Sequence, residues 1–134
     1  VSTAIVRFYY PYGPGCERYL VGRLIEAVKT GKEINIEGEE GVLVNPTYLS
    51  DLANGVALLL ESDSEGILHL AGPEKISLRQ LINLIGKLVG KQPSINSIPA
   101  KIPGGHAGSY KRSSQILGYC PQVSIETGLK QLIQ

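Results

Sequence analysis

The chain has few cysteines, and this shortage excludes two classes of protein. Cys16 and Cys120 are the only cysteines, they lie far apart, and only two histidines accompany them. This set lacks the spacing of a disulfide framework and of a structural zinc site. We therefore expect two reduced thiols and no bound metal, as in a protein of the cytoplasm.

The chain also lacks an excess of charge and a long apolar run. Thirteen basic residues face 12 acidic ones, so the net charge of +1 gives no electrostatic argument for nucleic acid or an anionic membrane. The closest approach to a basic patch is Lys111-Arg112, a pair expected to be solvated. No apolar run approaches the ~18 residues of a membrane span, and no signal-peptide pattern is present. We predict a cytoplasmic protein without membrane or nucleic-acid partners.

What is present is the composition of one folded domain. The 134 residues are 43% hydrophobic and 19% charged, which is enough to bury a core. Thr3–Tyr10 is almost continuously apolar or aromatic and predicts a strand covered on both faces. A Pro/Gly loop ends it, and the apolar stripe of Glu17–Thr30 predicts a helix closed by Gly31.

Further elements follow from periodicity and turn residues. Alternation in Glu33–Val44, with the segment from Gly38 to Gly41 as its turn, predicts a hairpin. A helix is expected from Ser50 or Asp51, then a strand over Ile67–Ala71. Ser77 and Gln80 have the spacing of a capping box before another amphipathic helix. The remaining predicted elements are a strand at Ser94–Ile98 and short helices at 113–117 and 125–133.

The two outer strands predict the core of an α/β fold. Thr3–Tyr10 and Ile67–Ala71 could pair in parallel, with the helix over Asp51–Ser62 packed behind them as the crossover. Two parallel strands form a poor sheet alone, because their apolar faces need more neighbours. The pattern therefore indicates part of a larger α/β body, whose uncovered faces would favour self-association.

The familiar catalytic motifs are missing. No P-loop, Rossmann G-x-G-x-x-G or G-x-S-x-G elbow is present. None of the seven tyrosines has a lysine four residues on; the closest pair is Tyr19 with Arg23. A guanidinium supplies charge but relays no proton, so we assign no catalytic residue. Asp51 is predicted to cap its helix or sit in the first turn. His69 is predicted to lie in the core, or behind a residue that contacts a ligand, with its ring bonded to backbone.

The ordered motifs resemble a known family. The stretches "RFYYPYGPG", "VNPTYLSDLANGVALLLES", "GILHLAGPEKISLRQLINLIGKLVGKQP" and "LGYCPQVSIETGL" look like the C-terminal half of an extended short-chain dehydrogenase/reductase. This is the family of NAD-dependent epimerases and dehydratases that act largely on nucleotide sugars. The resemblance implies an α/β fold: a partial Rossmann-type parallel sheet, two strands with a crossover helix, plus a small mixed α/β substrate-binding lobe made of Glu17–Val44 and Ser77–Gln134.

The resemblance also implies where ligands bind. Tyr9, Tyr10 and Pro11 would line the boundary between cofactor and substrate, at the carboxyl ends of the strands. The substrate, a small molecule such as a nucleotide sugar, would contact Tyr10, Tyr12, Asn45, Tyr48 and His106. NAD or NADP would bind the full-length protein, with no tight binding to this chain alone. The alternative is that the aromatic residues only pack the sheet.

The chain departs from the family at three polar positions. The family usually places Asn at the position of Tyr10 and Arg at that of Val44. The phosphate-gripping Arg-x-Gly-Asp would fall on Ile102-Pro103-Gly104-Gly105. Losing one charge-assisted hydrogen bond costs about 1.5–3 kcal/mol, so the usual diphosphate pose is weakened.

Two hypotheses follow. In the first, the chain is the substrate-binding part of an epimerase, dehydratase or reductase, excised or naturally truncated. It would be inactive alone, because the dinucleotide motif and Tyr-x-x-x-Lys lie upstream in such enzymes. In the second, it is a non-catalytic remnant that serves as a binding or oligomerisation module.

Overall fold

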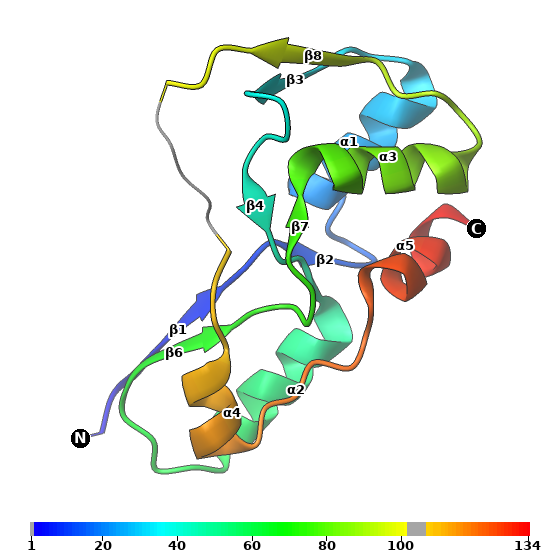
Figure 1. The fold of residues 1–134 in the computed structure, drawn as a ribbon. Helices are drawn as coiled ribbons and strands as arrows, with labels where there is room; N and C mark the ends of the chain where they lie inside the picture. Colours follow the sequence, from blue (N-terminus) through cyan, green and yellow to red (C-terminus); the bar gives the residue numbers. More distant parts are fainter. Residues whose placement is uncertain (1, 102–106) are drawn as a thin grey trace.

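Two parallel strands from distant parts of the sequence form the sheet near the N-terminus. The computed structural model describes residues 2–101 and 107–134. Strand β1 (Ala4–Phe8) pairs in parallel with β6 (Gly66–Leu70), Ala4 opposite Gly66 and Phe8 opposite Leu70. Helix α2 (Leu49–Leu60) lies beside this pair and is part of the connection between β1 and β6 (Figure 1). The predicted pairing and the α/β fold class are confirmed.

The sheet is less covered than the apolar run predicts. Ile5 is 55% exposed and Phe8 52% exposed, so the expectation of two covered faces is wrong for β1. A sheet of two strands cannot shield its own faces, and the helices beside it reach only some of the side chains. The expectation that apolar surface would stay uncovered holds.

Helix α4 (Lys111–Leu117) belongs with this sheet and not with the lobe to which we assigned it. It packs on β6 and α2. The Ser113 hydroxyl donates to the carbonyl of His69 at 2.6 Å, and the Tyr119 hydroxyl just after the helix donates to the carbonyl of Ala71 at 2.9 Å. We call β1, β6, α2 and α4 the sheet region.

Three amphipathic helices form the second region, which we call the helical lobe. They are α1 (Leu20–Thr30), α3 (Leu78–Val89) and α5 (Ile125–Ile133), and α3 packs against both of the others (Figure 1). Gly31 closes α1 with φ of 73°, a left-handed conformation that glycine adopts without strain. The predicted stripe of α1 is buried at Val21, Leu24, Ile25 and Val28.

The predicted capping box at the start of α3 is present. The backbone amide of Gln80 donates to Ser77 Oγ at 3.1 Å, and the backbone amide of Ser77 donates to Gln80 Oε1 at 3.1 Å. The Ser77 hydroxyl also donates to Glu40 Oε2 at 2.6 Å. These bonds satisfy amides that have no partner inside the helix.

The predicted hairpin at Glu33–Val44 is wrong. Strand β3 (Ile34–Glu37) pairs in parallel with β8 (Ile95–Ile98), and β4 (Leu43–Val44) pairs antiparallel with β7 (Ile76–Ser77). The chain does turn at Gly38, but it does not return along β3. Alternating burial identifies a strand without identifying its partner, and here each partner comes from a distant segment.

A fourth strand pairing joins the two regions. Strand β2 (Pro11–Tyr12) continues the chain beyond β1 and pairs in parallel with β5 (Thr47–Tyr48), which leads directly into α2. At the carboxyl end of β1 the chain therefore passes from the sheet region into the helical lobe through β2, and it returns to the sheet region through β5 (Figure 1). This crossing is where the resemblance predicts a ligand.

Candidate functional site

The segment after β1 is held by backbone contacts and one threonine. The Tyr9 amide donates to the carbonyl of Leu70 at 3.3 Å. Buried Thr47 donates from its hydroxyl to the carbonyl of Tyr9 at 2.7 Å and from its amide to the carbonyl of Tyr10 at 3.2 Å. Tyr9 and Tyr10 are therefore fixed at the carboxyl end of the parallel pair.

Tyr10 has a strained backbone. Its φ is 48°, and it is the only non-glycine residue with positive φ in the described ranges. Bulky L-residues rarely adopt this conformation, whereas Asn tolerates it well. This gives a physical reason for the Asn that the family usually places here. Burial, followed by the neighbouring Tyr9, raises the pKa of the Tyr10 hydroxyl.

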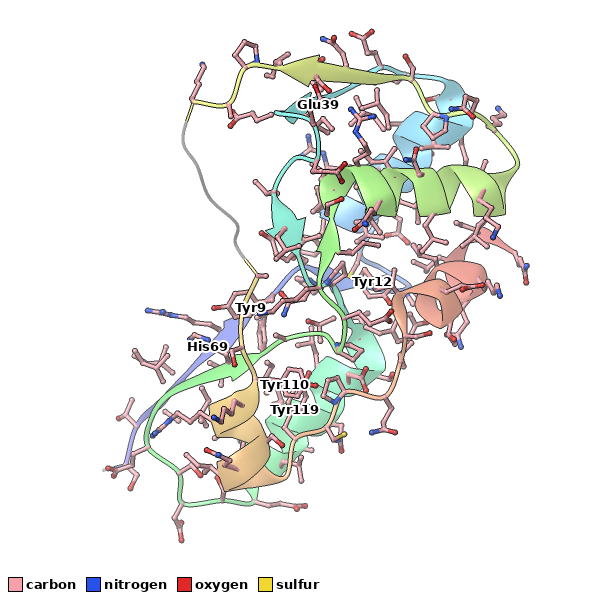
Figure 2. The ribbon with its side chains drawn as sticks, in the orientation of Figure 1. Tyr9, Tyr12, Glu39, His69, Tyr110 and Tyr119 are labelled. Atoms are coloured by element: carbon pink, nitrogen blue, oxygen red, sulfur yellow. The ribbon has the colours of Figure 1, made fainter. Side chains whose placement is uncertain are left out.

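Tyr9 is paired with His69. The Tyr9 hydroxyl and His69 Nδ1 lie 3.2 Å apart, and the ring centroids are 5.3 Å apart (Figure 2). The prediction that the His69 ring bonds backbone is therefore wrong, because the contact of its ring is a tyrosine hydroxyl. The pairing follows from the register of β1 and β6, which no local pattern specifies.

Asn45 binds the backbone of Gly108 with both ends of its amide. Its Nδ2 donates to the Gly108 carbonyl at 2.8 Å, and the Gly108 amide donates to Oδ1 at 3.0 Å. Asn45 is only 1% exposed. A Cβ on Gly108 would come within 2.4 Å of the Tyr9 ring, so Gly108 fits here because it has no side chain. In this arrangement Asn45 positions the 107–110 segment, although it also borders a cavity.

Tyr12 and Tyr48 lie in the core of the helical lobe. Their rings form an edge-to-face pair with centroids 5.3 Å apart, and Tyr12 is 1% exposed. The Tyr12 hydroxyl donates to the carbonyl of Ser124 at 3.4 Å. Burial, then the charge of Glu74, raises the pKa of Tyr12 above its ordinary value. Substrate contact by these two tyrosines stays a prediction, and the packing assigns them a structural role.

Val44, His106 and the segment 102–105 are the remaining positions named from the sequence. The Val44 side chain is fully buried in the lobe core, so the position where the family usually has Arg carries no charge here. His106 and the segment from Ile102 to Gly105 lie outside the described residues.

Asp51 has a role that the sequence did not reveal. It lies in the first turn of α2, as predicted, and is buried. Its Oδ1 accepts from the Gln122 amide at 2.9 Å and its Oδ2 from the Val123 amide at 3.0 Å. The carboxylate therefore ties the sheet region to the segment that leads into α5. The two donating amides lie 71 and 72 residues away in the sequence, a separation that capping rules do not address.

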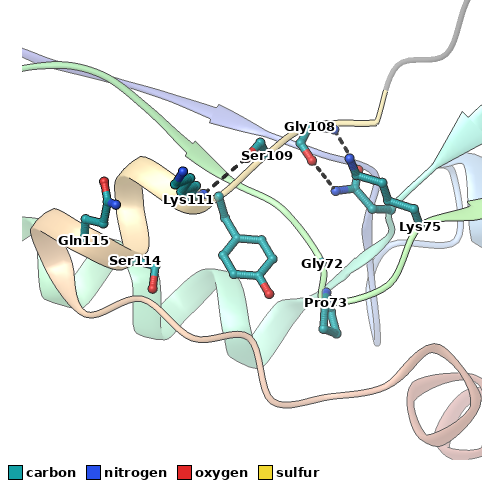
Figure 3. Close-up of a pocket in the computed structure, with 10 residues that line it drawn as sticks. Gly72, Pro73, Lys75, Gly108, Ser109, Lys111, Ser114 and Gln115 are labelled. Carbon is teal, nitrogen blue, oxygen red and sulfur yellow. Dashed lines mark hydrogen bonds between the residues drawn. The ribbon is translucent and has the colours of Figure 1, made fainter.

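A polar cavity opens beside Asn45 and Gly108. Its volume is about 490 Å³, within the range of small-molecule sites. Figure 3 shows the connection between β6 and β7 on one side and α4 on the other. The lining side chains include Lys75, Ser109, Lys111, Ser114 and Gln115.

A second hollow in the surface is an apolar groove. It has a volume of about 700 Å³ and runs between the start of α1 and helix α2. Pro11, one of the predicted rim residues, contributes to it, and Leu60 at the end of α2 is 81% exposed. The other apolar lining residues include Phe8, Tyr19, Leu49, Leu52 and Val56.

Two other kinds of site are absent from residues 2–101 and 107–134. No group of three or more His, Cys, Asp or Glu residues there could hold a metal ion. None of the helices described combines the length and apolar character that a bilayer crossing requires.

Comparison with curated proteins gives relatives along nearly the whole chain. It is 29% identical over 138 residues to UDP-glucuronate 4-epimerase of Thermodesulfobacterium geofontis, covering 99% of this chain and 42% of that protein. It is 26% identical to UDP-glucuronic acid decarboxylase 1 of Xenopus tropicalis, covering 99% of this chain and 33% of that protein. The chain thus spans less than half the length of these relatives. No protein-family model matches it.

Solved structures have the same fold. A UDP-glucuronic acid 4-epimerase from Bacillus cereus, in complex with NAD, aligns with a TM-score of 0.78 at 25% identity, covering 95% of this chain and 40% of that one. MoeE5 in complex with UDP-glucose and NAD aligns with a TM-score of 0.82 at 23% identity, covering 98% and 46%. These matches confirm that the chain resembles the C-terminal part of an extended short-chain dehydrogenase/reductase of the NAD-dependent epimerase/dehydratase family.

Proposed function

We propose that this chain is the substrate-binding part of an NAD(P)-dependent epimerase, dehydratase or reductase that acts on a nucleotide sugar, with residues 1–134 as one unit. The observation that carries the proposal is the match along 99% of the chain to a UDP-glucuronate 4-epimerase. In open α/β sheets, ligands bind outside the carboxyl ends of the strands, and Tyr9, Tyr10 and Pro11 follow β1 there. These three residues border the nicotinamide and the sugar in this proposal.

The dinucleotide-binding part packs against the apolar groove and the free edge of β1. Half-exposed Ile5 and Phe8 and the protruding Leu60 support this proposal, because such surface is normally buried in a protein–protein or domain interface. The sequence contains no G-x-G-x-x-G and no Tyr-x-x-x-Lys. The proton transfer and the dinucleotide grip therefore belong to that other part. By itself this chain binds NAD or NADP weakly and catalyses no reaction.

Calorimetric titration tests the proposal. NADH, UDP-glucuronic acid and UDP-glucose are titrated onto the 134-residue chain and onto any longer polypeptide that contains it. We expect the longer polypeptide to bind NADH and at least one UDP-sugar, and the short chain to show no turnover. A longer polypeptide that binds neither class of ligand would contradict the enzyme proposal. Turnover by the short chain would contradict its dependence on another part.

A second candidate function is self-association, in which the chain acts as an oligomerisation module. The observation that favours it is the same exposed apolar surface around Phe8 and Leu60. Sedimentation velocity at micromolar concentrations separates the candidates. An oligomer abolished by Phe8→Ser or Leu60→Ser, but not by Leu43→Ser at an exposed position of β4, supports self-association. A monomer throughout the concentration range excludes it.

A further inference from the structure

The polar cavity beside Asn45 has an unbalanced set of charges. Lys75, from the connection between β6 and β7, and Lys111, from the first turn of α4, both line it, and no acidic side chain is among its described lining residues. In Figure 3 the two lysines lie on opposite sides of Ser109 and Gly108. Segments 36 positions apart in the sequence thus bring two cations to one cavity of small-molecule size.

The neighbouring charges strengthen this imbalance. A smaller adjoining hollow of about 360 Å³ shares Ser109 and Lys111 with the cavity and adds Arg112 and His69. The single ion pair in the described part of the chain joins Lys130 to Glu126, so neither cavity lysine is neutralised by a carboxylate there. A cleft lined by one sign of charge concentrates ligands of the opposite sign.

The acidic residue nearest in sequence is directed elsewhere. Glu74 precedes Lys75, but its Oε1 accepts a hydrogen bond from the Ile125 amide at 2.8 Å, at the start of α5. Glu74 therefore supports the helical lobe.

The cavity also offers neutral hydrogen-bond donors and a fixed wall. The hydroxyls of Ser109 and Ser114 and the amide of Gln115 can each donate to an anionic oxygen. The paired bonds between Asn45 and Gly108 hold the wall that separates the two lysines. Two ammonium groups with several donors suit a tetrahedral anion with more than one negative oxygen.

We propose that Lys75 and Lys111 form the phosphate-binding site of this chain, which takes the diphosphate of a nucleotide sugar. This proposal rests on the proposed function for the nucleotide sugar, but its anion site is testable without it. The site supplies the positive charge that Val44 and Ile102 do not provide at the positions where the family usually has Arg. Lys111-Arg112, expected from the sequence to be a solvated pair, becomes part of a binding surface.

The experiment is a calorimetric titration of the 134-residue chain with inorganic diphosphate, UDP and UDP-glucose at low ionic strength. We expect Lys75→Gln and Lys111→Gln each to weaken diphosphate binding by about threefold to tenfold, as for exposed charges that contact phosphate. Lys75→Arg should retain most of the affinity. The matched control is Lys87→Gln, which removes the same charge from an exposed position of α3 away from the cavity.

Each outcome decides between the two proposals. No diphosphate binding at millimolar concentration, or equal weakening by Lys87→Gln, overturns the phosphate site. If UDP-glucose binds with unchanged affinity when Lys75 or Lys111 is replaced, the phosphate site is also overturned. The proposed function still stands in that case. Lysine-dependent binding of diphosphate without any binding of UDP or UDP-glucose supports the anion site and counts against the nucleotide-sugar function.

Discussion

The helical lobe and the sheet region bury their apolar residues to very different extents. The lobe has a continuous core, and its side chains come from all three helices and from Tyr12, Val44 and Tyr48. The sheet region has a small cluster, in which the fully or nearly buried members are Leu52, Leu70 and Tyr119. Yet β1 and β6 are as apolar as the lobe helices, and several of their side chains are exposed.

This difference shows that the core of the lobe is closed, whereas part of the apolar surface of the sheet region stays exposed. Apolar burial stabilises a fold by roughly 25 cal/mol per Å², so the lobe carries most of the stability of the chain. In the function proposed above, the exposed apolar surface of the sheet region packs against the dinucleotide-binding part. The cavity and the strained Tyr10 lie near the junction of the two regions, which is the pairing of β2 with β5.

The largest predicted effect separates the two regions directly. Leu81→Ala removes a fully buried side chain of α3 and should lower the free energy of unfolding by about 2–5 kcal/mol. Phe8→Ala in the sheet region should cost about 1 kcal/mol or less, because half of the ring is already solvated. Urea unfolding of both variants measures this. Equal losses would break the comparison.

The junction is tested by Asp51→Ala. The change leaves the amides of Gln122 and Val123 without their carboxylate and should cost about 1.5–3 kcal/mol. Asp63→Ala, at an exposed position beyond α2, is the control and should be nearly neutral. If Asp51 couples the regions, their unfolding transitions in the variant should also cease to coincide when followed by different probes. A variant as stable as the control would refute this role.

A somewhat smaller effect is expected at the wall of the cavity. Gly108→Ala places a methyl group against the Tyr9 ring and should cost about 1–3 kcal/mol by overpacking. Tyr9→Ala clears the space, so the same change should cost less in that background. A double-mutant cycle from urea unfolding measures the coupling. Additive losses would mean that the 107–110 segment does not pack on Tyr9 in solution.

The smallest effect concerns the backbone of Tyr10. Positive φ disfavours β-branched side chains and suits Asn, so Tyr10→Val should be about 1–2 kcal/mol less stable than Tyr10→Asn. Both replacements remove the ring, so their difference isolates the backbone term. Thermal or urea unfolding of the pair is sufficient. Equal stabilities would indicate that this residue does not hold its left-handed conformation in solution.

Much of the local structure was predictable, because it depends on neighbours in the chain. The stripe of α1, the glycine that ends it and the Ser77–Gln80 capping box all involve residues within a turn or two of each other. The parallel pairing of β1 and β6 also followed, since a crossover helix between two apolar strands leaves few alternatives. Hairpin pairing at 33–44 failed because alternation does not choose a partner.

The candidate site was less predictable. Tyr9, Tyr10 and Pro11 lie at the expected end of β1. Their neighbours Tyr12 and Tyr48 belong to the lobe core, which sequence alone could not distinguish from a binding surface. The lysine pair of the cavity gave no signal at all, because 36 positions separate its members.

By itself, the sequence determined the fold class, most helices and the resemblance to nucleotide-sugar epimerases and dehydratases, because hydrophobic periodicity and turn chemistry act over short stretches of chain. The tertiary structure alone decided which tyrosines are buried, that Asn45 binds Gly108, that Asp51 joins the two regions and that Lys75 and Lys111 line one cavity. Each of these arrangements brings together segments far apart in the chain. Their free energy comes from the packing of the whole molecule, which no local pattern encodes.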